Sequence, residues 1–162
     1  MRIDLRGRRV LALGGAGEVQ SAVVAALAGC GAAVDARPFG AAPGIACDSP
    51  EAATAAAAGY VAAVGRPDLL VNLSATAGFD EGAAEVPGEA AWFANATRAF
   101  APFLGRVVNV VSVAGLVPMR EAIGRSVHHA GLAALTRGLA MELAPKVLVN
   151  ALAVGALGQG GD

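Results

Sequence analysis

Short apolar segments alternate with longer Ala-rich segments along most of the chain, and this alternation limits the fold more than any single motif does. A short apolar run bounded by Gly or Pro is typical of a buried strand, and a longer periodic segment is typical of a helix. Strands that alternate with helices favour a parallel, doubly wound sheet covered on both faces. The predicted strands are residues 9–13, 32–35, 68–73, 107–112 and 147–152, and the predicted helices are residues 16–28, 51–64, 89–104 and 123–143.

Residues 45–47 have the composition of a third strand, but only the segment ARPFGAAPG separates them from the strand at residues 32–35. A parallel crossover normally needs a dozen or more residues and usually includes a helix. We therefore predict that the helix between the second and third strands is missing. The length of 162 residues and the lack of a low-complexity linker predict a single domain over residues 1–162.

The composition restricts the partners that the chain can have. Lys and Arg total 12 against 13 Asp and Glu, so no basic field is present to gather nucleic acid or an anionic membrane. Hydrophobic residues make up 56% of the chain and charged residues 15%, and the mean hydropathy is +0.58. So few charges indicate that another subunit covers some apolar surface, with an Ala-rich coding bias as the alternative.

The sequence also bears on location and metal binding. No uninterrupted apolar segment reaches the roughly 18 to 20 residues that span a bilayer. The N-terminus MRIDLRGRRVLALGG is unlike a secretory signal, so we expect a cytoplasmic location. Cys30 and Cys47 lack the spacing of metal ligands and are expected to be small buried side chains, so we predict no metal site.

Four segments carry a resemblance to a known family: LALGGAGEVQSAVVAALAGCGAAV, PDLLVNLSA, RVVNVVSVAG and HHAGLAALTRGLAMELAPKVLVNALAVGAL. Together they resemble the short-chain dehydrogenase/reductase (SDR) family over nearly the whole chain. The resemblance implies a Rossmann-type sheet and, in active members, hydride exchange between a nicotinamide cofactor and an alcohol or carbonyl. It also implies that the chain is shortened: Val154 replaces the Pro of a Pro-Gly turn, Gly155 remains, and the substrate lid and the last strand are missing.

The first turn of the family has the form T-G-x-x-x-G-x-G, in which glycines let the backbone approach the cofactor pyrophosphate at a helix N-terminus. The four defined positions are here Leu13, Gly14, Glu18 and Gln20. Gly14 alone is retained, and Glu18 would oppose a diphosphate by its charge and its bulk. Gly15 and Gly17 offer the turn an alternative, shifted register.

Other positions that the resemblance assigns to the cofactor are also altered. Arg37 lies near the position that reads the ribose 2′ substituent and would suit a 2′-phosphate, whereas Asp35 would suit a 2′-hydroxyl. A solvated strand end is the alternative for both. Asp48 resembles the residue that contacts the adenine region, and Asn72 resembles the first Asn of the N-N-A-G motif, which continues here as Leu73-Ser74-Ala75. We expect this chain to bind no cofactor, with NAD or NADP as the group if one is bound.

The positions of the family's catalytic residues differ most from the family pattern. Ser112 stands at the position of the family's catalytic Ser, and Arg125 and His129 stand at its Tyr and Lys positions. A guanidinium keeps its proton at physiological pH and cannot replace the Tyr acid, and a mostly neutral imidazole does not reproduce the Lys ammonium. The family also has a catalytic Asn, but Asn95 lies too close to Ser112 in sequence to carry that role over. Ser112 is therefore vestigial in this interpretation.

Alternatives remain open for these residues. Ser112 can simply end a strand and bond to the backbone. Arg125 and His129 lie one helical turn apart, so with Ser112 they form a candidate anion-binding cluster. His128 is expected at an interface or on the surface.

The resemblance implies that the helices near residues 89–104 and 123–143 build dimers and tetramers, and some of the same side chains must pack on the sheet. Our leading hypothesis is a non-catalytic subunit that pairs with an active, full-length SDR or with itself. The resemblance connects such heteromers with acyl-CoA and aromatic compound metabolism. The alternatives are an NAD(P)-dependent oxidoreductase with atypical catalytic residues and a binding module for an acyl carrier or small anion near Arg125.

Overall fold

The computed structural model describes residues 3–15, 17–40, 44–74, 88–118, 120 and 122–155. Five parallel strands form one sheet in the order β2-β1-β3-β4-β5. The strands are β1 (Arg9–Gly14), β2 (Ala33–Arg37), β3 (Leu69–Leu73), β4 (Arg106–Ser112) and β5 (Leu148–Val154). The helices are α1 (Gly17–Gly29), α2 (Pro50–Val64), α3 (Glu89–Phe100) and α4 (Ile123–Leu143), and the short 3₁₀ helix η1 (Val113–Gly115) follows β4.

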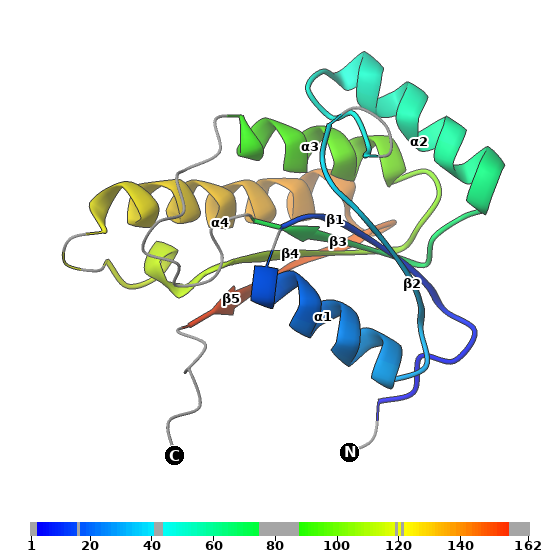
Figure 1. Ribbon diagram of the computed structural model, residues 1–162. Helices are drawn as coiled ribbons and strands as arrows, with labels where there is room; N and C mark the ends of the chain where they lie inside the picture. The colour runs from blue at the N-terminus through cyan, green and yellow to red at the C-terminus, as the bar shows by residue number, and fades with distance from the viewer. Residues whose placement is uncertain are drawn as a thin grey trace.

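Helices lie on both faces of this sheet. Figure 1 shows α2, α3 and α4 on one face and α1 on the other. The two larger apolar clusters follow the same division: Leu70 and Val107 pack with α2, α3 and α4, whereas Val10 and Val71 pack with Val19 of α1. This is the doubly wound α/β architecture that the alternating pattern predicts, and that prediction is confirmed.

The direction in which the chain adds strands to the sheet reverses at β1, which has β2 on one side and β3 on the other. The chain leaves β1 through α1 to reach β2 on one side, and it returns through α2 to β3 on the other side of β1. In open α/β sheets, ligands bind in the crevice outside the carboxyl ends of the strands at such a switch point. The carboxyl ends of β1, β3 and β4 are therefore where a functional site is expected.

Local signals explain the element boundaries well. Ser49 accepts a hydrogen bond from the backbone N–H of Ala52 at 3.1 Å, and Pro50 opens α2, so this helix has a standard N-cap followed by a proline in its first turn. Gly65 ends α2 with φ 103°. The predicted helix over residues 123–143 has the bounds of α4, whereas the helix predicted over residues 89–104 ends earlier, at Phe100.

The connection between β2 and α2 is short, as predicted. Residues 38–40 and 44–49 contain no helix, and residues 41–43 lie outside the described part of the chain. The proposed strand over residues 45–47 is reduced to an isolated parallel bridge between Phe39 and Ile45. A one-residue bridge makes too few hydrogen bonds to add a strand to the sheet. The predicted loss of the lid and last strand concerns the segment from residue 156 onward, which is also outside the described residues.

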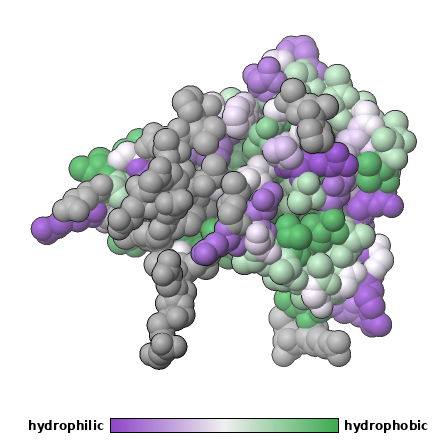
Figure 2. Space-filling view, viewed as in Figure 1, coloured by the Kyte–Doolittle hydropathy of each residue, from purple (hydrophilic) through white to green (hydrophobic). Residues whose placement is uncertain are grey.

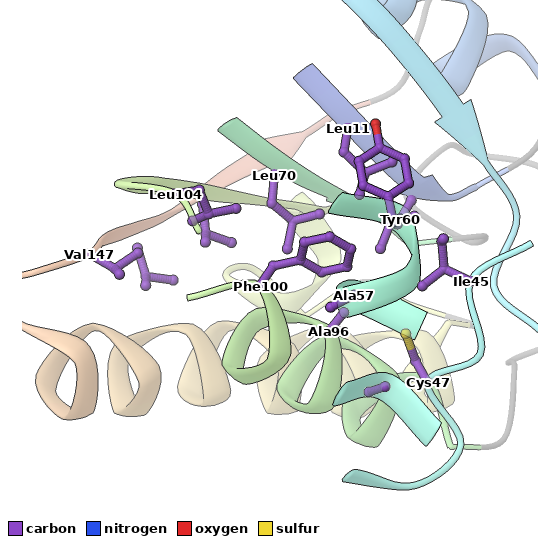
Figure 3. Packing of buried hydrophobic residues seen from close by; sticks show 14 of the residues in the cluster. Leu11, Ile45, Cys47, Ala57, Tyr60, Leu70, Ala96, Phe100, Leu104 and Val147 are labelled. Carbon is purple, nitrogen blue, oxygen red and sulfur yellow. The ribbon is translucent and has the colours of Figure 1, made fainter. Parts of the chain in front are cut away.

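Large side chains from β1, β3, α2 and α3 fill the main core (Figure 3). Tyr60 and Phe100 meet edge to face with their ring centroids 5.7 Å apart. Ala57 and Ala96 are fully buried, and their small side chains let α2 and α3 approach each other closely. The core is thus built from a few aromatic rings surrounded by Ala, Leu and Val.

Apolar residues also remain at the surface. Figure 2 shows apolar side chains gathered over α1, on the face seen in Figure 1. Large exposed side chains also occur on α4 and β5, where Met141 is 83% exposed and Leu148 and Leu152 are each 53% exposed. None of the helices in the described ranges is both long enough and apolar enough to cross a membrane.

Candidate functional site

The glycine turn after β1 lies at the switch point. Gly14 and Gly15 have φ values of 77° and 68°, a left-handed conformation that favours glycine. The side chain of Gln20 donates a hydrogen bond to the Gly14 carbonyl at 3.0 Å and ties the turn to α1. A Cβ on Gly14 would lie 2.7 Å from the Leu73 carbonyl oxygen and would also overlap the ring of Phe39. The bare glycine backbone is therefore covered by an aromatic side chain of the same chain.

Phe39 belongs to an aromatic group that spans the carboxyl ends of β1 and β3. Its ring centroid lies 5.5 Å from that of Trp92 and 5.9 Å from that of Phe93, and both rings come from α3. Phe93 is fully buried. The position of Phe39 follows from the short β2–α2 connection, because the bridge from Phe39 to Ile45 turns the chain back over the sheet immediately after β2.

The first turn departs from the pattern that binds a nicotinamide dinucleotide. Its pyrophosphate would have to approach the backbone of the first turn closely, which is the reason glycines are needed there. At Gly14, the first of the glycine positions, a Cβ would meet the Phe39 ring, so this part of the turn packs against a side chain of the same chain. Glu18 lies in the first turn of α1, where its carboxylate favours the helix dipole but opposes a second anion. The turn therefore differs from the phosphate-binding pattern in two ways: Phe39 packs against Gly14, and Glu18 places a carboxylate in the first turn of α1.

The two residues that were candidates to read the cofactor ribose are paired with each other. Arg37 donates to both carboxylate oxygens of Asp35, from Nε at 2.8 Å and from Nη2 at 3.1 Å. This bond and the charge of Asp35 raise the pKa of Arg37. Asp48 is exposed at the far end of the β2–α2 connection.

Asn72 is part of a buried polar network instead of a cofactor contact. Its Nδ2 donates to Asn109 Oδ1 at 2.9 Å and to Thr97 Oγ1 at 3.2 Å. Asn109 Nδ2 in turn donates to Thr136 Oγ1 at 2.9 Å, and Thr136 donates to the Leu132 carbonyl. The network joins β3, β4, α3 and α4, and the Asn72 Oδ1 atom has no hydrogen-bond partner among the described residues. Asn95, by comparison, donates to the Cys47 carbonyl at 2.9 Å.

Ser112 and His129 lie together at the carboxyl end of β4. The backbone N–H of Ser112 donates to His129 Nδ1 at 3.1 Å, so a neutral His129 ring carries its proton on Nε2. Ser112 Oγ accepts from the Ala114 N–H at 3.2 Å and caps η1. Both residues have 0% exposure. Arg125 lies one turn earlier on α4 and is half-buried.

A second polar group lies at the same edge of the sheet and was missed by the motif comparison. Glu89 Oε2 accepts a hydrogen bond from Ser74 Oγ at 2.7 Å and lies 2.8 Å from His128 Nε2. Glu89 is 2% exposed, Ser74 is 3% exposed, and the His128 side chain is 15% exposed. His128 also meets the His129 ring edge to face at 5.1 Å. His128 is expected from the sequence at an interface or on the surface; the structure shows it half-buried, because α4 begins against Glu89 at the start of α3.

The chain topology explains this convergence. Ser74 follows β3, Glu89 begins α3, and His128 lies in the second turn of α4, so all three stand near the carboxyl ends of the strands. The only sequence signal was the position of each residue at the end of a strand or the start of a helix. Within the described ranges, no three His, Cys, Asp or Glu side chains are grouped in a way that could hold a metal ion.

Comparisons with solved structures identify similar folds. A dehydrogenase/reductase from Sinorhizobium meliloti has 27% sequence identity and a TM-score of 0.70, and the match covers 95% of this chain and 74% of that chain. A short-chain dehydrogenase/reductase from Serratia marcescens has 23% identity and a TM-score of 0.66, with 92% and 74% covered. A Pseudomonas aeruginosa short chain oxidoreductase, described as containing an atypical catalytic center, has 24% identity and a TM-score of 0.73, with 94% and 71% covered.

No curated protein matches the sequence. The short chain dehydrogenase family, however, matches residues 7–159, which is nearly the whole chain. This match covers every strand and helix described above, including the glycine turn, Ser112 and α4. The chain therefore belongs to the short-chain dehydrogenase family.

Proposed function

We propose that this chain is a non-catalytic SDR subunit that assembles with an active member of the family. The observation that carries the proposal is the Phe39 ring on the Gly14 backbone. A member of the family that packs Phe39 against the first glycine of its turn and has Glu18 and Gln20 in place of the other two is poorly suited to hold the hydride carrier. On the sequence grounds given above, we place the complex in the cytoplasm and in the metabolism of acyl-CoA or aromatic compounds.

The state of the catalytic positions supports the same proposal. Ser112 and His129 have no exposed surface and are held by backbone hydrogen bonds, so a substrate carbonyl does not reach them. Arg125 carries a guanidinium, which has hydrogen-bond donors but no acceptor and so cannot take up a substrate proton. General acid–base catalysis needs a group within hydrogen-bond reach of the substrate and with a suitable pKa, and these three positions do not combine the two.

The outer face of α4 is the surface that we assign to the partner. Val127 is 68% exposed and Met141 is 83% exposed. Between them, a Cβ on Gly131 or Gly138 would have no atom within 4 Å, so the backbone of another helix can approach closely there. Arg98 of α3 binds Glu142 of α4 through both carboxylate oxygens, at 2.8 and 2.7 Å, which fixes α3 beside this face.

The aromatic side chains of α3 contribute less to this surface than the family resemblance suggests. Phe93 and Phe100 are fully buried in the core of this chain, and Trp92 packs on Phe39. A helix in a doubly wound fold buries one face on its own sheet. We therefore assign the partner contact to α4 and leave α3 as its support.

Co-expression with a full-length SDR encoded beside this chain tests the assembly. We expect the two proteins to co-purify, and we expect Met141→Lys to abolish co-purification while Leu152→Lys, a similar change on β5, preserves it. Assembly is refuted if the proteins never co-purify and the full-length enzyme is fully active alone. Calorimetry of the isolated chain with NADH and NADPH tests the lack of a cofactor site, and binding at micromolar concentrations would contradict it.

A second candidate function rests on the group formed by Ser74, Glu89 and His128. A buried carboxylate that holds an imidazole is an arrangement suited to proton transfer. The Pseudomonas aeruginosa short chain oxidoreductase, which has a similar fold, is described as containing an atypical catalytic center. In this candidate the chain is an oxidoreductase with atypical catalytic residues. Turnover of an alcohol with NAD or NADP by the purified chain, lost in His128→Gln, would favour it over the non-catalytic subunit.

A further inference from the structure

β5 is an outer strand of the sheet, and none of the described residues pairs with its outer edge. Its sequence LVNALAV contains no charged residue and no proline. Natural proteins usually protect an exposed edge with a charge, a proline or a bulge, because the unpaired N–H and C=O groups bind another strand. Over its seven residues, β5 has neither a charged residue nor a proline to protect its edge.

The unpaired groups belong to alternate residues. The N–H of Leu148 donates to the Gly105 carbonyl just before β4, so the backbone N–H and C=O groups of Leu148 face inward, toward β4. Because the direction alternates along a strand, Asn150 and Leu152 also point inward, while Val149 and Ala151 point their N–H and C=O groups outward. A strand that pairs with β5 must therefore bond to Val149 and Ala151.

The apolar side chains next to this edge lie on the face of the sheet that α1 covers elsewhere. Leu152 is the register partner of Val110, which packs with Val19 of α1. Leu148 and Leu152 are each 53% exposed, so α1 does not extend over them. A strand added at β5 would cover part of this surface.

We propose that β5 pairs antiparallel with β5 of a second copy of this chain, which joins the two sheets into one across a two-fold axis. With Asn150 opposite its own copy, the outward residues Val149 and Ala151 form the hydrogen-bonded pairs. Leu148 and Leu152 then face each other twice as non-hydrogen-bonded pairs, the closer of the two types. Each Asn150 amide is both donor and acceptor and can bond to its copy.

The other sheet edge is a poorer partner for β5. β2 is only five residues long and carries the ion pair of Asp35 and Arg37. A β5–β2 contact would also be head-to-tail, and such contacts build open filaments unless the rotation closes a ring. Self-pairing of β5 uses the same patch twice and closes at a dimer. The proposal does not depend on the absence of catalysis or on an SDR partner.

Analytical ultracentrifugation of the full chain without any partner tests the proposal. We expect a monomer–dimer equilibrium in the micromolar range, and at least a tenfold weaker dimer in Leu152→Lys and in Asn150→Lys. Each change places two lysines near the two-fold axis, on side chains whose exposure lets the fold tolerate them. Met141→Lys is the matched control on α4 and should leave the dimer unchanged.

Amide hydrogen exchange provides the second readout. We expect the N–H groups of Val149 and Ala151 to be protected in the dimer and to exchange rapidly in Leu152→Lys, whereas the N–H of Leu148 stays protected in both. The proposal is overturned if the chain is monomeric throughout the micromolar range, or if Met141→Lys rather than Leu152→Lys dissociates the dimer. The second result would place the self-contact on α4.

Discussion

The substitution Phe39→Ala tests whether the chain closes its own nucleotide crevice. Complete burial makes a Phe→Ala change cost about 3 to 5 kcal/mol. Phe39 is half-buried and packs on Gly14, Trp92 and Phe93, so we expect a loss of about 2 kcal/mol in the free energy of unfolding. For a domain of this size that loss lowers the Tm by about 4 to 8 °C.

The same change uncovers the turn. Without the ring, the Gly14 backbone becomes accessible, and Glu18→Gln removes the carboxylate from the first turn of α1. We expect the double variant to bind NAD measurably in calorimetry, while the unaltered chain does not. Phe103→Ala is the matched control, because Phe103 is also half-buried but lies just before β4, at the amino ends of the strands and away from the glycine turn.

Two results would refute this reasoning. If the unaltered chain binds NAD or NADP at micromolar concentrations, the Phe39 ring does not exclude the cofactor. If the free energy of unfolding of Phe39→Ala differs from that of the unaltered chain by less than about 0.5 kcal/mol, the ring does not pack on the turn as described. A gain of binding in Phe103→Ala would show that loosening the fold, rather than opening the crevice, admits the nucleotide.

Three further predictions test the buried contacts that hold the strands and helices around the site. Asn109→Ala removes two buried hydrogen bonds and should lower the unfolding free energy by about 3 kcal/mol in urea titrations; a loss below about 1 kcal/mol would contradict a structural network. Gly115→Ala places a Cβ 2.7 Å from the Ala130 nitrogen and should cost about 2 to 3 kcal/mol by pushing α4 away. Burial raises the pKa of Cys47 from 9.0 to about 12 and that of Tyr60 from 10.0 to about 12. The unfolded chain therefore loses these protons first, and stability should fall as pH rises from about 9 to 12, less steeply in Cys47→Ala and Tyr60→Phe.

The sequence predicts the fold well because its signals are local. Gly and Pro mark most of the boundaries, and α4 has the predicted bounds because a long helical pattern is unambiguous. The switch point follows from the strand order, which the family resemblance implies. The one strand that does not form, at residues 45–47, is also the one whose preceding connection is too short for a crossover.

The site is less predictable because it depends on contacts between distant segments. Nothing near Phe39 in sequence indicates that its ring meets Gly14, 25 positions earlier, or α3, more than 50 positions later. The sequence assigns a family position only to His129 and gives no sign of a partner for His128. In the structure His129 accepts the Ser112 N–H, and His128 meets Glu89 at the start of α3. A motif comparison assigns positions, but the packing of α3 against α4 decides which side chains interact.

The two proposed contact surfaces lead to a prediction about stoichiometry. The exposed face of α4 carries Val127 and Met141, whereas β5 is an outer strand of the sheet. If both surfaces are occupied together, two copies of this chain joined at β5 each present α4 to one active SDR. We expect native mass spectrometry of the co-purified complex to give equal numbers of the two proteins and two copies of this chain. Leu152→Lys should divide that assembly into halves that still contain one of each protein. A complex that keeps its mass in Leu152→Lys would mean that the partner, and not a second copy, covers β5.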